Sequence, residues 1–167
     1  MTMTQPVINT FGPVYDKDSK ILILGTMPSP KSREVGFYYS HPQNRFWTTI
    51  AEVLDSKLPS TRAEKEEFLY FHGIALWDVL ASCHIAGADD SSIKDAEIND
   101  FTKLFADAQI KAVFTTGKKA TALFIKHCQH KYGYEPIYLP STSPANCKMP
   151  QQELTAAYGA ILCALKK

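Results

Sequence analysis

Residues 21–47 read ILILGTMPSPKSREVGFYYSHPQNRFW, and this stretch decides the fold. Its four leading apolar residues predict a short strand that is buried on both faces. The strand breaks at Gly25 into a loop of small, polar and aromatic residues. In an open α/β sheet, the loop at the carboxyl end of such a strand is where ligands bind. The two tyrosines, the histidine and the asparagine on this loop therefore indicate a flat aromatic ligand with polar edges.

Strands and helices alternate along the rest of the chain. Strands are expected at residues 20–24, 74–80, 110–115 and 136–139. Helices are expected at residues 42–54, 62–72, 95–105, 116–130 and 151–165, and a polar loop at residues 82–93. Alternation of this kind implies parallel strands joined by right-handed crossovers. We predict an α/β fold, a three-layer α/β/α sandwich with a central, mainly parallel four-stranded sheet. We expect residues 1–167 to form one domain, with residues 1–19 as an irregular N-terminal arm.

The composition is that of an ordinary globular protein, with 45% hydrophobic and 21% charged residues. A chain of 167 residues is long enough to bury roughly 70% of its unfolded surface in one domain. No run approaches the ~20 apolar residues of a membrane span, and the first residues lack the pattern of a signal peptide. We expect a cytoplasmic monomer with no membrane partner.

The overall charge does not by itself indicate a nucleic-acid partner, because the formal net charge is only +1. A DNA partner would need local positive charge, since phosphate contacts supply most of the non-specific affinity. Basic side chains that follow strand ends are Lys31, Arg33, Lys118, Lys119 and Lys148.

The cysteines give no sign of a metal site. Cys83, Cys128, Cys147 and Cys163 include no closely spaced pair, which tetrahedral zinc and iron–sulfur sites usually contain. We predict four free thiols, with Cys163 in the core, and neither a metal nor a cofactor.

Three loops at strand ends could carry chemistry. The first belongs neither to GxGxxG nor to GxxxxGK[ST], so dinucleotide and P-loop sites lack their phosphate cradle. The second, TGKK at residues 116–119, looks like a phosphate-binding turn, but a glycine at this place more often just precedes a helix. The third, LPSTSPAN at residues 139–146, brackets three hydroxyl groups with two prolines. Prolines stiffen a loop and hydroxyl groups suit phosphate oxygens, although a helix-capping turn would look the same.

Taken together, GTMPS, GFYYSHPQNRFW and LPSTSPAN resemble the uracil-DNA glycosylase superfamily, and most closely its deoxyinosine (hypoxanthine)-DNA glycosylase family. The resemblance runs from residue 21 to about residue 146. It implies a base excision repair enzyme that flips a deaminated base out of DNA and hydrolyses its N-glycosidic bond. The implied substrate is deoxyinosine, which carries hypoxanthine, with uracil and xanthine as further candidates. The implied partner is DNA that contains deaminated bases.

The resemblance also implies a base-binding pocket. Either Tyr38 or Tyr39 would stack on the flipped base, and backbone N–H groups of residues 26–29 would stabilise the anionic leaving base. The predicted pocket residues are Gly25, Thr26, Met27, Pro28, Ser29, Tyr38, Tyr39 and His41.

Asn44 is the predicted catalytic residue. Many relatives hold the attacking water with an Asp or Asn of the first motif, but Met27 stands at the corresponding position here. Because a thioether cannot activate water, we expect Met27 to be an apolar wall of the pocket. Asn44 is the nearest polar group that could orient a water or grip a purine edge, and the alternative is that it caps a helix. His41 either contacts the base or holds the loop.

The third loop is expected to grip the DNA backbone and to push a side chain from residues 145–148 into the gap left by the flipped base. The predicted DNA-binding residues are Ser141, Thr142, Ser143, Pro144, Ala145, Asn146 and Lys118. His84, where relatives lead us to expect an arginine, is a further candidate at the pocket rim.

The pocket motifs contain no lysine for a Schiff base, so the glycosylase should be monofunctional and leave an abasic site. A non-catalytic DNA-damage binding protein and a nucleoside or nucleotide hydrolase remain the alternatives.

Overall fold

The computed structural model describes residues 4–166, and its centre is a parallel sheet of four strands. The strand order is β3-β2-β6-β7, with β2 at Ile21–Gly25, β3 at Ile74–Asp78, β6 at Ala112–Thr116 and β7 at Ile137–Leu139. In β2, Leu24 pairs with Trp77 of β3 and Thr115 of β6, and Gly25 pairs with Asp78. Three strands therefore end side by side at one edge.

Strand β2 is buried on both faces, as its apolar run predicts. Ile21 and Ile23 pack with α2, α3 and α7, whereas Leu22 and Leu24 pack with α4 and α5. All four side chains are fully buried, with 0% exposed surface. Because alternate residues of one strand enter opposite cores, β2 joins the two helical layers to the sheet.

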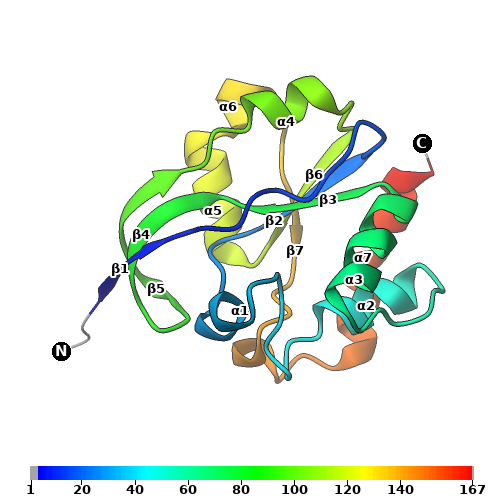
Figure 1. Ribbon diagram of the computed structural model, residues 1–167, viewed down its shortest axis with the longest axis horizontal. Coiled ribbons are helices and arrows are strands. Elements are labelled where there is room, and N and C mark those ends of the chain that lie inside the picture. The colour runs from blue at the N-terminus through cyan, green and yellow to red at the C-terminus, as the bar shows by residue number, and fades with distance from the viewer. Residues whose placement is uncertain (1–3, 167) are drawn as a thin grey trace.

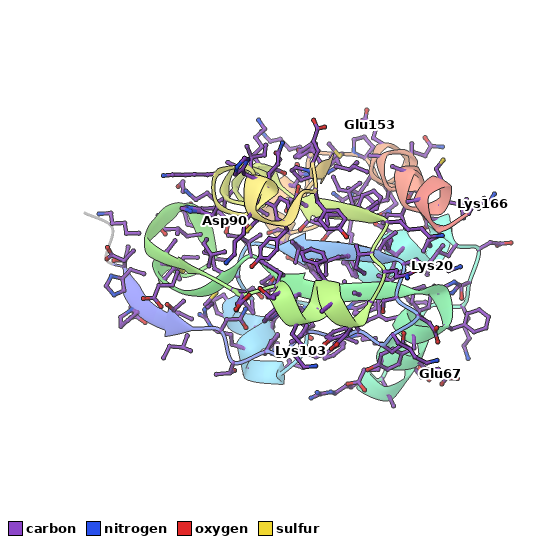
Figure 2. The ribbon with its side chains drawn as sticks, turned by 90° about the horizontal axis from the view of Figure 1, so that it is seen from above. Lys20, Glu67, Asp90, Lys103, Glu153 and Lys166 are labelled. Atoms are coloured by element: carbon purple, nitrogen blue, oxygen red, sulfur yellow. The ribbon has the colours of Figure 1, made fainter. Side chains whose placement is uncertain are left out.

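The helices complete the three predicted layers. They are α1 (Pro30–Val35), α2 (Phe46–Val53), α3 (Arg62–His72), α4 (Thr102–Asp107), α5 (Lys118–His127), α6 (Gln129–Tyr132) and α7 (Gln151–Leu165). Helices α2, α3 and α7 cover one side of the sheet, and α4, α5 and α6 lie on the other side (Figure 1). Side chains fill the space between sheet and helices, whereas the labelled Glu67, Lys103 and Glu153 lie at the periphery (Figure 2). The predicted α/β/α fold is confirmed, and the central sheet is entirely parallel.

A second sheet corrects three predictions. Strands β1 (Gln5–Ile8), β4 (Leu80–Ala86) and β5 (Asp89–Ile98) form an antiparallel sheet in the order β1-β4-β5. The predicted loop at residues 82–93 is therefore a hairpin, and the predicted helix at 95–105 shrinks to α4. The arm predicted to be irregular at residues 1–19 contains β1, and over residues 9–19 its one strand-like contact is the isolated bridge between Val14 and Leu76. Polar side chains on the exposed face of the hairpin conceal the strand pattern from sequence reading.

Several element ends also differ from their predicted positions. The predicted helix at 42–54 starts only at Phe46, and the one at 116–130 breaks at Cys128 into α5 and α6. Helix α1 was not predicted; the Ser29 hydroxyl accepts from the N–H of Ser32 (3.1 Å) and Pro30 occupies its first turn. Cys163 is exposed, which contradicts its predicted core position. None of the helices in the described part of the chain is long and apolar enough to cross a membrane.

Candidate active site

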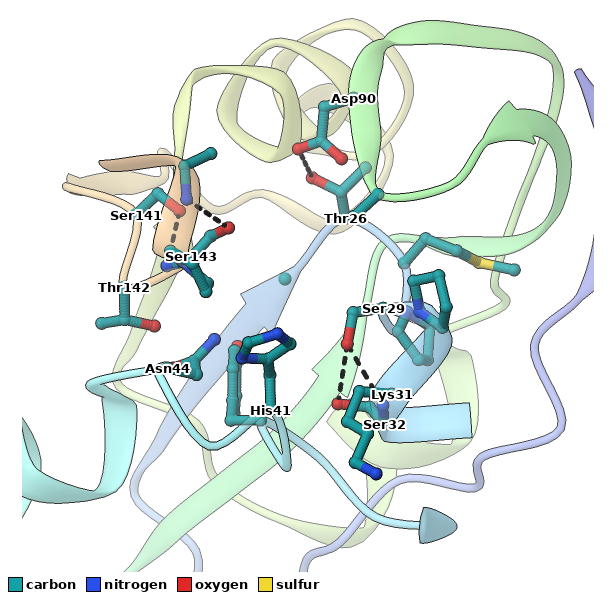
Figure 3. Close-up of a pocket in the computed structure, with 18 of the residues that line it drawn as sticks. Thr26, Ser29, Lys31, Ser32, His41, Asn44, Asp90, Ser141, Thr142 and Ser143 are labelled. Atoms are coloured by element: carbon teal, nitrogen blue, oxygen red, sulfur yellow. Dashed lines mark hydrogen bonds between the residues drawn. The ribbon is translucent and has the colours of Figure 1, made fainter. Parts of the chain in front are cut away.

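A cavity of about 770 Å³ opens at the edge where β2, β3 and β6 end (Figure 3). Its wall contains every residue that the sequence predicted for catalysis or base binding. The third loop closes one side of the cavity with residues 141–145. The structure therefore brings the first and third loops to a single site, although about a hundred residues separate them in the chain.

The side chain of Asn44 performs a structural task with one atom and leaves the other free. The N–H of Phe46 donates to Asn44 Oδ1 (2.9 Å), so this oxygen caps the start of α2. That bond also fixes which end of the amide is nitrogen. No described residue accepts a hydrogen bond from Asn44 Nδ2, and this nitrogen points into the space between the two loops (Figure 3). Capping and a role in the pocket are thus compatible.

His41 holds the loop in a similar way. Its Nδ1 accepts a hydrogen bond from the N–H of Gln43 (3.0 Å), and its carbonyl oxygen accepts from the N–H of Asn44 (2.9 Å). In the neutral ring the proton therefore lies on Nε2. His41 also lines the cavity, so Nε2 could still donate to a ligand.

The two tyrosines have different surroundings. Tyr38 is a core residue, 3% exposed, whose hydroxyl donates to the carbonyl of Gly12 (2.7 Å). Tyr39 has a left-handed backbone (φ 52°), which is strained for an aromatic residue, and its ring stacks on Phe46 with centroids 3.9 Å apart. One face of the Tyr39 ring is therefore already covered, and stacking on a base would need the other face.

Gly25 lets three polar groups meet at the end of the sheet. A Cβ atom at this position would lie 2.7 Å from Asp78 Oδ1, 3.2 Å from the Tyr39 hydroxyl and 3.7 Å from Thr116 Oγ1. The Tyr39 hydroxyl is buried and makes no hydrogen bond of good geometry to a described residue, although Thr116 lies near enough to lower the pKa of the phenol. Such a group destabilises the fold by roughly 1–3 kcal/mol unless a ligand satisfies it.

Asp78 is a buried carboxyl group that the sequence did not assign to the site. It ends β3, lines the cavity and is only 3% exposed. Burial raises its pKa from 3.8 to about 7; the hydrogen bond from Asn9 Nδ2 to Oδ2 (3.2 Å) opposes that shift, and the nearby charge of Asp90 adds to it. Near neutral pH this carboxyl can therefore exist with or without its proton.

Asp90 is the second carboxyl group in the wall, and it comes from the hairpin. Its Oδ2 accepts a hydrogen bond from Thr26 Oγ1 (3.2 Å), which ties the hairpin to the first loop (Figure 3). Burial also raises the pKa of Asp90. Glu34, which follows the first loop on α1, is no candidate for this role because its side chain is 72% exposed. Distant elements supply the acids of the site instead.

Arg45 holds the third loop against the first. Its Nη1 donates to the carbonyl of Met149 (2.8 Å), its Nη2 to the carbonyl of Asn146 (3.0 Å) and its N–H to the carbonyl of Thr142 (3.1 Å). Within the third loop, the hydroxyl of Ser141 accepts from the N–H of Ser143 (3.1 Å). The guanidinium fork thus positions the predicted DNA-gripping segment.

Some predicted residues lie away from the cavity. Asn146 closes the third loop by donating from Nδ2 to the carbonyl of Ser141 (2.8 Å), and Lys118 is exposed at the start of α5; neither lines the cavity. Thr142 lines it but is only 2% exposed. His84 is not at the rim, because it faces Asp95 on the hairpin at 3.0 Å.

One lysine borders the cavity, contrary to the impression given by the motifs. Lys31 of α1 lines it, with its amine 3.6 Å from Glu34 and its side chain 40% exposed. No cluster of histidine, cysteine or acidic residues suited to a metal ion occurs within residues 4–166.

A model of the uracil DNA glycosylase superfamily matches residues 13–166 of this chain. The chain belongs to that superfamily. Proteins named hypoxanthine DNA glycosylase from Methanosarcina barkeri (strain Fusaro) and Methanosarcina acetivorans are 37% and 36% identical to it over 138 residues. Each match covers 81% of this chain and 86% of the relative. The chain is thus a DNA glycosylase, a hydrolase of N-glycosyl bonds.

A solved structure supports the same assignment. The solution NMR structure of a candidate uracil DNA glycosylase from Methanosarcina acetivorans superposes with a TM-score of 0.77 at 31% identity. The match covers 94% of this chain and 97% of that one.

The first prediction from this geometry concerns the pH dependence of stability. Because folding raises the pKa of Asp78 from 3.8 to about 7, the folded protein holds a proton that the unfolded chain releases in that interval. The contribution of Asp78 to the free energy of unfolding therefore falls as the pH rises from about 4 to about 7. Asp78→Asn should abolish this pH-dependent decrease, and it should raise the free energy of unfolding at pH ~8.

Urea unfolding between about pH 5 and about pH 8 measures the effect. Asp107→Asn is the matched control, because Lys103 and Tyr15 lower the pKa of the Asp107 carboxyl and it is already ionised in that range. An equal pH slope in wild type and Asp78→Asn would show that Asp78 is not held with a raised pKa.

A second prediction concerns the Arg45 fork. Arg45→Ala should destabilise the protein by roughly 2–4 kcal/mol, because two charge-assisted hydrogen bonds to carbonyl groups are lost. Arg45→Lys should recover only part of this, since a lysine lacks the planar fork. Unfolding curves and affinity for lesion-containing DNA are the measurements. Unchanged stability and affinity in Arg45→Ala would show that the Arg45 fork does not hold the third loop in place.

Proposed function

We propose that this protein is a monofunctional DNA glycosylase of base excision repair that releases deaminated bases, above all hypoxanthine from deoxyinosine. Uracil and xanthine are the further candidate bases. The proposal rests on the free Nδ2 of Asn44, a hydrogen-bond donor that faces the cavity while its amide oxygen is held by Phe46 N–H. The names of the two Methanosarcina relatives support the same substrate.

A fixed donor distinguishes deaminated bases from their parents. Adenine carries an amino donor at position 6, and deamination to hypoxanthine replaces it with the acceptor O6. The same exchange converts the N4 amino group of cytosine into the O4 acceptor of uracil. A donor at Asn44 Nδ2 would therefore pair with the deaminated base and would be left unpaired against the parent. Unpaired buried donors are costly, so this contact favours the lesion.

The remaining groups of the cavity fit the hydrolysis of a glycosidic bond. The N–H groups of Met27 and Ser29 make no backbone hydrogen bond within the described residues, so they are free to donate hydrogen bonds to a leaving base. Met27 lines the cavity as an apolar wall. Lys31 pairs with Glu34 at the border, which argues against a Schiff base and for an abasic product.

The third prediction is direct. The protein should release hypoxanthine from a duplex that contains one deoxyinosine, in the presence of EDTA, and should leave the strand intact until alkali treatment. A matched duplex with deoxyadenosine should not react. Activity lost on chelation, or strand cleavage before alkali, would contradict a metal-independent monofunctional reaction. Binding without excision would indicate a damage-binding protein, and neither would indicate a hydrolase of free nucleosides.

The fourth prediction separates the two roles of Asn44. Asn44→Ala should reduce single-turnover excision by ~10²-fold or more and also lower the melting temperature, because donor and cap are both lost. Asn44→Asp keeps an oxygen for Phe46 N–H but offers no donor to the base. It should retain the stability and lose the excision. If Asn44→Asp excises hypoxanthine as well as the wild type, Asn44 is only a cap.

A further inference from the structure

A buried acid lies at the floor of the cavity, and the fold uses only one of its two carboxyl oxygens. Asp78 Oδ1 faces Gly25, and only its other oxygen, Oδ2, accepts a hydrogen bond, from Asn9. The Tyr39 hydroxyl converges on the same point. Asp78 Oδ1 and the Tyr39 hydroxyl therefore both lie beside Gly25, and neither makes a hydrogen bond of good geometry to a described residue. Such a pair of polar atoms marks the place of a ligand atom.

The position of Asp78 determines which part of a substrate it can meet. A flipped nucleotide enters the cavity base first, while its sugar stays near the DNA backbone at the mouth. Asp78 lies at the sheet edge that forms the floor and is 3% exposed, so it faces the base and not the sugar. The water that attacks the sugar carbon must therefore be held elsewhere.

On this basis, and resting on the proposed function, we infer that Asp78 is the general acid that protonates the leaving purine at N7. N7 and O6 are neighbouring acceptors on one edge of hypoxanthine, so a neutral carboxyl group at N7 complements the amide donor of Asn44 at O6. The geometry thus assigns two donors to the two acceptors of that edge.

The proton balance of the step is closed. The C1′–N9 bond breaks and its electron pair moves into the purine, while the proton of the Asp78 carboxyl group forms the N7–H bond. Hypoxanthine leaves as a neutral molecule. Water adds its hydroxyl group to C1′, and the proton that it releases restores the Asp78 carboxyl group through solvent once the base has gone. No metal, oxidant or further reactant is required.

The surroundings of Asp78 hold the acid near its neutral form. The titratable groups that interact with it are Tyr38 and Tyr39 from the first loop and Asp90 from the hairpin. Burial keeps both tyrosines uncharged by raising the pKa of each, and Asp90 contributes negative charge. Burial and Asp90 therefore favour the protonated carboxyl group, and Asn9 opposes them.

The test is the pH profile of single-turnover excision from deoxyinosine DNA, measured from about pH 5.5 to about pH 9. In the wild type the rate should be level at low pH and fall about tenfold per pH unit above the pKa of Asp78, near 7. Asp78→Asn should lower the low-pH rate by roughly 10²-fold or more and should lose the falling limb. Melting curves check that the variant is folded.

Two neighbours supply matched variants that should move the limb in opposite directions. Asp90→Asn removes a negative charge and should shift the limb to lower pH, whereas Asn9→Ala removes a hydrogen bond to the carboxylate and should shift it to higher pH. A limb that stays in place in both variants, or that survives in Asp78→Asn, would assign the titration to another group and overturn the inference.

The outcomes also separate this inference from the proposed function. An absence of hypoxanthine release at every pH would contradict the proposed function itself. Release at a rate that is level or rises through neutral pH would leave that function standing and would refute Asp78 as the acid, because a general base gains activity as it loses its proton.

Discussion

The hydrogen bond from Phe46 N–H to Asn44 Oδ1 fixes the start of α2, and the rest of the site depends on that start. Three consecutive residues act from this point. Asn44 turns its amide nitrogen to the cavity, Arg45 holds the carbonyl groups of the third loop, and Phe46 stacks on Tyr39. One helix end thus positions the Asn44 amide, the third loop and the strained tyrosine together. A rigid scaffold of this kind is what a reaction that depends on positioning requires.

The same burial that shapes the chemistry opposes stability. Asp78 and the Tyr39 hydroxyl would each be more stable in water, and the left-handed backbone of Tyr39 adds strain. The fully buried strand β2 and its two cores compensate for these unfavourable groups. Polar atoms that the fold leaves unsatisfied at one point of the cavity are the features that a bound base can satisfy.

The sequence predicted the elements whose pattern is strong, and it missed those whose partners lie far along the chain. Strand β2 follows from its apolar run, helices α3 and α7 follow from their place in the alternation of strands and helices, and the loops at the strand ends identified the cavity wall. The hairpin was missed because its exposed face is polar. Asp78 was missed because it was placed inside a strand predicted to run to residue 80. A single acid within the apolar run IALWDVL was the available signal, since a charge is not left in a buried strand without a reason.

The proposal that Asn44 presents a fixed donor to a deaminated base can be tested with a structure of the complex. The ligand would be a DNA duplex carrying a deoxyinosine analogue that fluorine at the sugar 2′ carbon makes resistant to hydrolysis. We expect hypoxanthine O6 at a hydrogen-bond distance of roughly 2.7–3.2 Å from Asn44 Nδ2, with Asn44 Oδ1 still bound to Phe46 N–H. A base that lies outside the cavity, or an Asn44 amide turned with its oxygen toward the base, would contradict it.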